Sequence, residues 1–334
     1  MFKPKDIFYN STTLVRKLLS INYLINFSSI KIIFPFYHTV SDKELIHIKH
    51  LYKIIDCKRF EKDLDMLLKY YTPLDHRDLI DIINNKKVIN KKCFFLSFDD
   101  GLSEIYHIVA PILVKKGIPA TFFLNSNFVD NKDVFFRYKT SILIELISND
   151  NSFKNIYFKW LKTNSFKSKS IMKNLLSISY NQRNLLDNLA DSLGYKFENY
   201  LSEKKPYMSS FQIQELANQG FAIGSHSIDH PLFQDINLKE QLRQTKESSN
   251  FVKTNFKLNY SLFAFPFNDI GVTKSFFDYF YKDKKTLDLS FGTSGIKDDL
   301  RKNNLQRIDM EKPNSDAKNI IKHEYLYYAL RKIL

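Results

Sequence analysis

Two short polar motifs, each placed at the end of an apolar run, constrain the fold of this chain most strongly. The first is SFDDG at residues 97–101, at the end of the aromatic stretch 92–98. The second is HSIDH at residues 226–230, which follows the apolar residues 221–224. Short apolar runs bounded by turn residues indicate buried strands. Strands that end in polar loops predict an α/β protein whose site lies at the C-terminal ends of its strands.

The residues around both motifs indicate alternating strands and helices. Residues 103–116 carry apolar side chains at helical spacing, Gly117 ends that helix, and residues 120–124 predict the next strand. Before the second motif, Ser209 and Gln212 form a capping-box pattern that begins another helix. We therefore expect a strand–loop–helix–strand arrangement in which both motifs occupy loops.

The residue types in these loops favour metal-assisted hydrolysis. One carboxylate and two imidazoles can hold a divalent metal and leave a position open for water. A second carboxylate is then free to act as a base on that water. His226 and His230 are four residues apart, and Pro231 excludes a long helix, so one helical turn or a tight loop is expected. Each motif alone is often incidental, whereas the two together indicate a site.

The two motifs resemble those of the polysaccharide deacetylases, the NodB-homology carbohydrate esterases of family four. FDDG at 98–101 resembles their first motif, and HSIDH resembles their second, His-Ser/Thr-x-x-His. Tyr37-His38 resembles an N-terminal Tyr-His of members that deacetylate exopolysaccharide. FAFPF at 263–267 and LQRI at 305–308 resemble later segments of exopolysaccharide and capsule-cluster members. The resemblance covers about residues 32 to 310.

This resemblance implies a distorted (β/α) barrel, commonly with seven strands, that removes N-acetyl groups from a cell-surface poly- or oligosaccharide. It implies a divalent metal, zinc before cobalt or nickel. By position, the implied metal ligands are Asp100, His226 and His230. Asp99 is then the catalytic base, and a backbone N–H near Phe267, in the segment with Pro266, matches the family's oxyanion donor.

Two departures from the family pattern affect other roles. Many relatives carry an arginine before the proline motif, but residues 263–265 contain none. We expect Arg307 to orient Asp99 instead, with a structural ion pair as the alternative. Many relatives also have a late histidine that protonates the leaving amine, whereas His323 lies in a context typical of a terminal helix. We therefore expect His38 to be the general acid, with a structural histidine as the alternative.

Length and composition predict one barrel-sized domain with additions. The 334 residues, 44% of them hydrophobic, suffice for a sizeable core. We predict an N-terminal amphipathic segment at 1–30, the barrel at 31–334, and a helical insertion at about 131–206 over the active-site face. Most aromatic residues of the insertion are expected to form its own core, and Arg137 and Tyr138 at its start are expected to lie near the site. Nothing supports a disulfide between the two cysteines.

The net charge of +14 and the pI near 9.4 favour anionic surroundings. An acidic glycan, a lipid-linked saccharide or a membrane surface would fit. Specific nucleic-acid binding is not expected, because the lysines are scattered and accompany no recognition motif.

The N-terminal region has no pattern of a secretory signal, so the predicted location is cytoplasmic or peripheral at the inner membrane face. Residues 12–27 predict an amphipathic helix that packs against the barrel or attaches to a membrane with the help of nearby basic residues. Its apolar side would carry Leu14, Leu18, Leu19 and Ile25.

Two other functions remain open from the sequence. One is a related metal-dependent amidohydrolase that acts on a small cyclic amide or ureide. The other is a noncatalytic glycan-binding protein that kept the barrel, for which the two departures are the best arguments. The free second carboxylate argues against the noncatalytic protein, because binding alone does not need a base.

Overall fold

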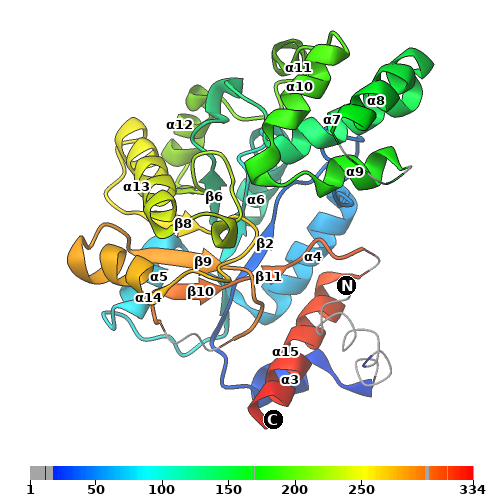
Figure 1. Ribbon diagram of the computed structural model, residues 1–334. Helices are drawn as coiled ribbons and strands as arrows, with labels where there is room; N and C mark the ends of the chain where they lie inside the picture. The colour runs from blue at the N-terminus through cyan, green and yellow to red at the C-terminus, as the bar shows by residue number, and fades with distance from the viewer. Residues whose placement is uncertain are drawn as a thin grey trace.

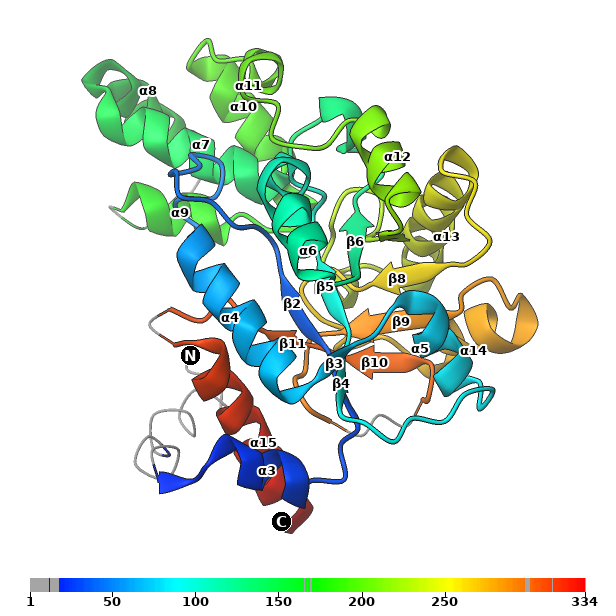
Figure 2. The same cartoon turned by 180° about the vertical axis from the view of Figure 1, so that it is seen from behind.

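Short parallel strands form a ring at the centre of the molecule (Figures 1 and 2). The computed structural model describes residue 12 and residues 18–333, apart from residues 165, 167, 169, 298–300 and 314. The order around the ring is β10-β9-β8-β7-β6-β5-β2-β11, and every pair is parallel. The strands are β2 (Pro35–Tyr37), β5 (Leu96–Phe98), β6 (Ala120–Leu124), β7 (Ala222–Ser225), β8 (Leu262–Ala264), β9 (Leu289–Gly292), β10 (Asn304–Gln306) and β11 (Ile308–Asp309).

The ring closes through one passage of chain that is interrupted at Arg307. The Arg307 N–H donates to the Gly292 carbonyl on β9 (3.0 Å), while the Ile308 N–H donates to the Phe34 carbonyl beside β2 (2.8 Å). The chain therefore changes partners at this residue, and β10 and β11 are counted separately. This confirms the predicted (β/α) barrel. Its strands number eight, compared with the seven commonly found in the family, because this last passage is counted as two strands.

A second, smaller sheet has the order β1-β4-β3, and its strands β1 and β4 directly precede the ring strands β2 and β5 in the chain. It consists of β1 (Ile32–Ile33), β3 (Thr72–Pro73) and β4 (Cys93–Phe94). The stretch 92–98, expected to be one strand, is divided at Phe95 because β4 pairs with β1 and β3 whereas β5 pairs with β2 and β6.

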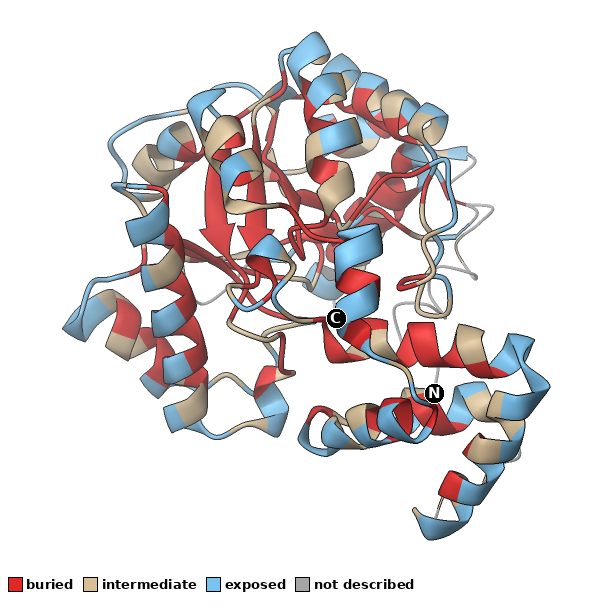
Figure 3. Cartoon of the chain, turned by 90° about the horizontal axis from the view of Figure 1, so that it is seen from above, coloured by how far each residue is buried: buried red, intermediate tan, exposed pale blue. Residues whose placement is uncertain are grey.

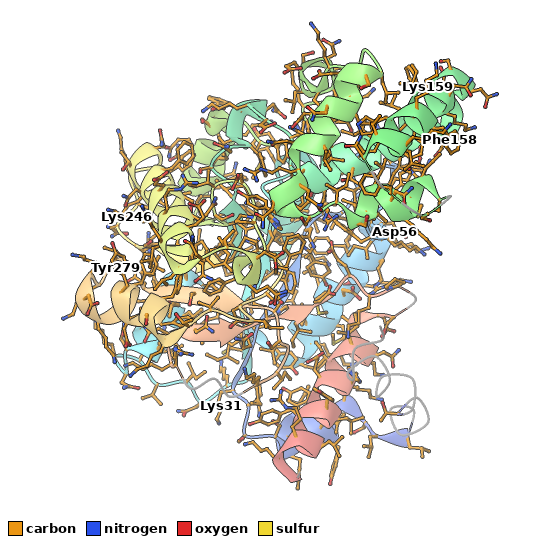
Figure 4. The ribbon with its side chains drawn as sticks, in the orientation of Figure 1. Lys31, Asp56, Phe158, Lys159, Lys246 and Tyr279 are labelled. Atoms are coloured by element: carbon orange, nitrogen blue, oxygen red, sulfur yellow. The ribbon has the colours of Figure 1, made fainter. Side chains whose placement is uncertain are left out.

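Helices surround the ring, and their outer faces are exposed while the strands are buried (Figure 3). The helix expected at 103–116 begins with a π-helical turn at Ile105–Val109, continues as α6, and ends at Gly117 in the left-handed conformation that glycine favours (φ 64°). The expected capping box at Ser209 and Gln212 begins α12. The helices that surround the ring are α4 (Cys57–Tyr70), α5 (His76–Ile83), α6 (Ala110–Lys116), α12 (Ser210–Asn218), α13 (Leu238–Asn255), α14 (Lys274–Asp278) and α15 (Ala317–Ile333).

Between β6 and α12, helices α7 to α11 form a layer at one end of the ring, here called the helical layer (residues 136–204; Figure 1). Tyr157 and Trp160 belong to a core that the layer shares with neighbouring loops, as expected for most of its aromatic residues. The layer consists of α7 (Phe136–Asn149), α8 (Asn151–Thr163), α9 (Ile171–Ser177), α10 (Asn184–Ser192) and α11 (Phe197–Lys204).

Helix α3 (Ile21–Phe27) packs against α15, on the far side of the molecule from the helical layer (Figures 1 and 2). It begins after Ser20, whose hydroxyl accepts the Tyr23 N–H (3.1 Å), and it buries Ile21 and Ile25. Leu18, expected on the apolar side of this helix, precedes the cap and is 86% exposed, so it does not share in the packing on α15. The remainder of the predicted helix, at 13–17, lies outside the described residues.

In the described part of the chain, no helix is long and apolar enough to cross a membrane.

Candidate metal and catalytic site

The two sequence motifs converge at the C-terminal end of the ring. Asp99 and Asp100 follow β5 directly, and His226 follows β7. The His226 N–H donates to the Leu124 carbonyl at the end of β6 (2.8 Å), which fixes the second motif beside the first. Strand order therefore brings together residues that are more than a hundred positions apart in the chain.

Three of these side chains present metal-binding atoms to a common point. The His230 Nε2 lies 3.1 Å from the His226 Nε2 and 3.3 Å from the Asp100 Oδ1, and the His226 Nε2 lies 3.6 Å from the same Oδ1. Ligands that are 2.0–2.2 Å from a tetrahedral zinc ion are separated by about 3.3–3.6 Å. The predicted metal ligands Asp100, His226 and His230 are thus brought together at the spacing that a zinc-sized ion needs.

The hydrogen bonds around this cluster also fit a metal. The Asp100 Oδ1 is buried, and among the described residues it has no hydrogen-bond partner. The His226 Nδ1 lies 2.8 Å from the Ala264 carbonyl; donation there leaves the Nε2 lone pair directed at the cluster. Burial lowers the pKa of His226 to about 4, so its ring is neutral at pH 7, as a ligand must be.

The loops that carry the ligands have strained backbones. Asp100, Ser227, His230 and Phe267 all have φ between 59° and 71°, a region that side chains other than glycine rarely adopt. Such strain persists where surrounding interactions hold it, and it concentrates at functional sites. Here the Ser227 Oγ accepts the His230 N–H (3.0 Å), so the second motif is a tight loop, one of the two predicted alternatives.

Arg307 holds Asp99 in a buried, two-pronged ion pair. Its Nη1 and Nη2 donate to the two Asp99 carboxylate oxygens at 2.7 and 2.8 Å, and Nη1 also donates to the Ser97 hydroxyl (3.1 Å). Burial acts to raise the pKa of Asp99, but the charge of Arg307 and, more weakly, those of His226 and His38 bring it below its usual value. Asp99 is therefore ionised and free of protons at neutral pH.

His38 is held by Glu311, a residue that the sequence analysis did not identify. The His38 Nδ1 lies 2.5 Å from the Glu311 Oε2, and the His38 and Thr39 N–H groups donate to the Oε1 at 2.9 and 3.2 Å. Burial alone would lower the pKa of His38, but the charge and hydrogen bond of Glu311, aided by Asp100 and Asp99, raise it to about 10. His38 is therefore an imidazolium at neutral pH. Glu311 follows β11 as Asp99 follows β5, and a carboxylate at that strand end was the available signal.

A cavity of about 480 Å³, a size typical of small-ligand sites, is lined by Asp99, the neighbour of Asp100 in the chain. His38 and Asp99 line it from the ring, together with Phe267 and Thr293. The helical layer contributes four further lining residues, two from α7 and two from the segment that joins α9 to α10: Phe136, Arg137, Ser179 and Tyr180.

The helical layer also contacts both motif loops. The Tyr138 hydroxyl donates to the Asp100 Oδ2 (2.7 Å), the oxygen that does not face the histidines. The Tyr180 hydroxyl donates to the Asp229 Oδ2 within the second motif (2.7 Å). The expectation that Arg137 and Tyr138 lie near the site agrees with their positions, while Tyr180 was not singled out.

The segment that contains Pro266 and Phe267 reaches the same cavity. Phe267 is 43% exposed and lines it, and its ring centroid lies 4.7 Å from that of His230. Proline has no N–H, so only the Phe267 backbone can act as an oxyanion donor of this pair. His323 lies within α15, as the sequence predicted, and does not line the cavity.

Comparisons with known proteins identify the family and support the fold. A family model described as polysaccharide deacetylase matches residues 86–276, more than half of the chain. The structure resembles that of the deacetylase PplD from Streptococcus pyogenes, with 15% identity, a TM-score of 0.56, and coverage of 89% of this chain and 99% of that chain. IcaB from Ammonifex degensii gives the same identity and TM-score, with coverage of 89% and 98%.

A de-N-acetylase from Aggregatibacter actinomycetemcomitans is also similar, with 16% identity, a TM-score of 0.51, and coverage of 86% of this chain and 99% of that chain. The search of curated proteins finds no match. At these identities the structural similarities support the fold, while the family model extends across both motifs. The chain therefore belongs to the polysaccharide deacetylase family and is a hydrolase of N-acetyl amides.

Proposed function

We propose that this protein is a metal-dependent N-deacetylase that acts on a cell-surface poly- or oligosaccharide of the capsule or exopolysaccharide type. One observation carries the proposal: three metal-binding atoms meet beside a second carboxylate that takes no part in their cluster. The proposed metal is zinc, with cobalt or nickel as alternatives. The proposed location is the cytoplasm or the inner membrane face.

Asp99 is suited to take the proton from the attacking water. When bound, the metal supplies a Lewis acid for the acetamide carbonyl and activates water. The Asp99 Oδ2 lies 3.8 Å from the ligand atom of His226, so the base is adjacent to the metal position without belonging to the ligand set. Because each carboxylate oxygen has two acceptor sites, the Arg307 bonds leave capacity for this proton. Arg307 thus orients the base and keeps it ionised.

His38 is suited to protonate the departing amine. Its Nδ1 is engaged by Glu311, which leaves the Nε2–H of the imidazolium to donate into the cavity. An amine leaves an amide readily only after protonation, so an acid on the cavity wall completes the division of labour. The Phe267 N–H is the proposed donor to the developing oxyanion.

The positions of Arg307 and His38 weaken the arguments for a noncatalytic protein. They rested on two missing groups, an arginine for the base and a histidine for the leaving amine. Arg307 and His38 supply the same chemistry from other positions, each with a buried carboxylate partner.

Substitutions at Asp99 and Asp100 should distinguish the catalytic base from the metal ligand. Asp99→Asn should lower the rate of acetate release by about 10²–10⁴-fold while metal is retained, because general-base catalysis contributes that much. Asp100→Asn should lose both activity and metal. The measurements are acetate release from a panel of N-acetylated glycans with zinc, cobalt or nickel, and metal content by elemental analysis.

Asp65→Asn is the matched control, since Asp65 pairs with Lys116 on the surface. It should change neither readout. An active Asp99→Asn protein would refute the base assignment, and full metal content in Asp100→Asn would refute the ligand assignment.

Glu311→Gln should lower the pKa of His38 from its value of about 10. The amide retains an acceptor oxygen for the two backbone N–H groups but loses the charge that offsets burial. Titration of the histidine ring signals by NMR gives this pKa, with His38→Gln identifying the resonance. In activity, the alkaline limb of the pH profile should move to lower pH. An unchanged His38 titration would contradict the pairing.

Tyr138→Phe should weaken zinc binding about tenfold or more, because hydrogen bonds to a metal-binding carboxylate typically contribute that much. Competition with a chelating dye measures the affinity. Tyr157→Phe is the control, since it removes a buried hydroxyl in the same helical layer whose partner is Asn174. Equal zinc affinities in both variants would show that Tyr138 does not support the metal site.

A further inference from the structure

We propose that Arg137 binds an acidic group of the substrate, a carboxylate or a phosphate, on a sugar close to the one that carries the scissile acetamide. This inference deepens the proposed function and rests on it. It assigns to the helical layer a role in selecting charged glycans.

Arg137 is placed to contact a bound glycan. It lines the same cavity as His38 and Asp99 and comes from the helical layer, not from the ring. The next residue, Tyr138, hydrogen-bonds to the proposed metal ligand Asp100. A group bound by Arg137 would therefore share one cavity with Asp99 and His38.

The Arg137 guanidinium has donors to spare. Among the described residues, its hydrogen bond is from Nη1 to the Leu176 carbonyl (2.7 Å), and no carboxylate lies within ion-pair distance. Arginine carries five N–H donors, in a fork that fits a carboxylate or phosphate. Four other arginines of the chain each have a carboxylate partner: Arg59, Arg183, Arg243 and Arg307.

Among the described residues, Arg137 has no counter-charge, although its guanidinium carbon lies 4.7 Å from the centroid of the Phe136 ring, a cation–π contact. Arg137 lies in the first turn of α7, at the positive end of the helix dipole, where acidic residues are favoured. Phe135 at the N-cap makes no side-chain cap, and the first turn contains no acid. Burial also lowers the pKa of Arg137, with no neighbouring carboxylate to offset the effect. An anion from the substrate would relieve these costs together.

The other charged groups of the cavity do not replace Arg137. The charge of His38 is balanced by Glu311. Asp235 and Asp309 also line the cavity and are exposed, which suits them to accept hydrogen bonds from sugar hydroxyls. Among the described residues that line the cavity, Arg137 is thus the cationic side chain without a carboxylate partner.

Binding of three defined probes to the zinc-loaded protein tests this inference. The probes are chitotetraose, which is neutral, a hyaluronan tetrasaccharide, which carries carboxylates, and UDP-N-acetylglucosamine, which carries phosphates. Titration calorimetry at low and moderate salt gives the affinities for wild type, Arg137→Gln, Arg137→Lys and the control Arg243→Gln. Arg243 is paired on the surface of α13, so its replacement makes the same change in net charge.

We expect wild type to bind at least one anionic probe about tenfold or more tightly than chitotetraose, as one charged hydrogen-bonding group provides. Arg137→Gln should lose this preference and keep its affinity for chitotetraose, and Arg137→Lys should retain part of it. Arg243→Gln should behave as wild type. The preferred anionic probe distinguishes a carboxylate from a phosphate. Wild type with no anionic preference, or Arg137→Gln that retains it, would overturn the inference.

Acetate release from the same mixtures keeps this test separate from the proposed function. Anionic preference without acetate release from any N-acetylated glycan would leave Arg137 supported and count against the deacetylase. Acetate release with no anionic preference would support the deacetylase and refute the role of Arg137.

Discussion

The buried pair of Arg307 and Asp99 connects the closure of the barrel to the proposed chemistry. Arg307 is the residue at which the chain passes from pairing with β9 to pairing with β2. Its side chain is fully buried, with the guanidinium over the ring of Phe36. A buried guanidinium is costly without a counter-charge, and removal of one partner of such a pair typically costs about 3–5 kcal/mol. The ion pair that neutralises Arg307 at the closing segment of the ring therefore also holds Asp99, the proposed base.

The helical layer completes the site in a second way. The loops after β5 and β7 adopt strained backbone conformations at Asp100, Ser227 and His230, and strain of this kind needs surrounding contacts to persist. Tyr138 and Tyr180 provide such contacts from the layer. The layer thus both contacts the loops that carry the proposed metal ligands and lines the cavity.

Much of the site was predictable because strand ends in a parallel barrel meet at one edge. Once the motifs at 97–101 and 226–230 were placed after strands, convergence of their side chains followed from topology. The position of His38 after an apolar run followed in the same way. The pairing of Arg307 with Asp99 remained one of two alternatives, since spacing along the chain carries no information about side-chain contacts 208 positions apart.

The sequence by itself determined the class of protein and the residues proposed as metal ligands, because local patterns and motif spacing encode strands, loops and ligand types. Only the tertiary structure decided which residues assist them. Glu311 meets His38 across 273 positions, and Tyr138 meets Asp100 from a separate layer, so neither contact has a local signature. The same limit applies to Arg137: its residue type was visible, but the absence of a carboxylate partner among the described residues depends on how distant segments fold around it.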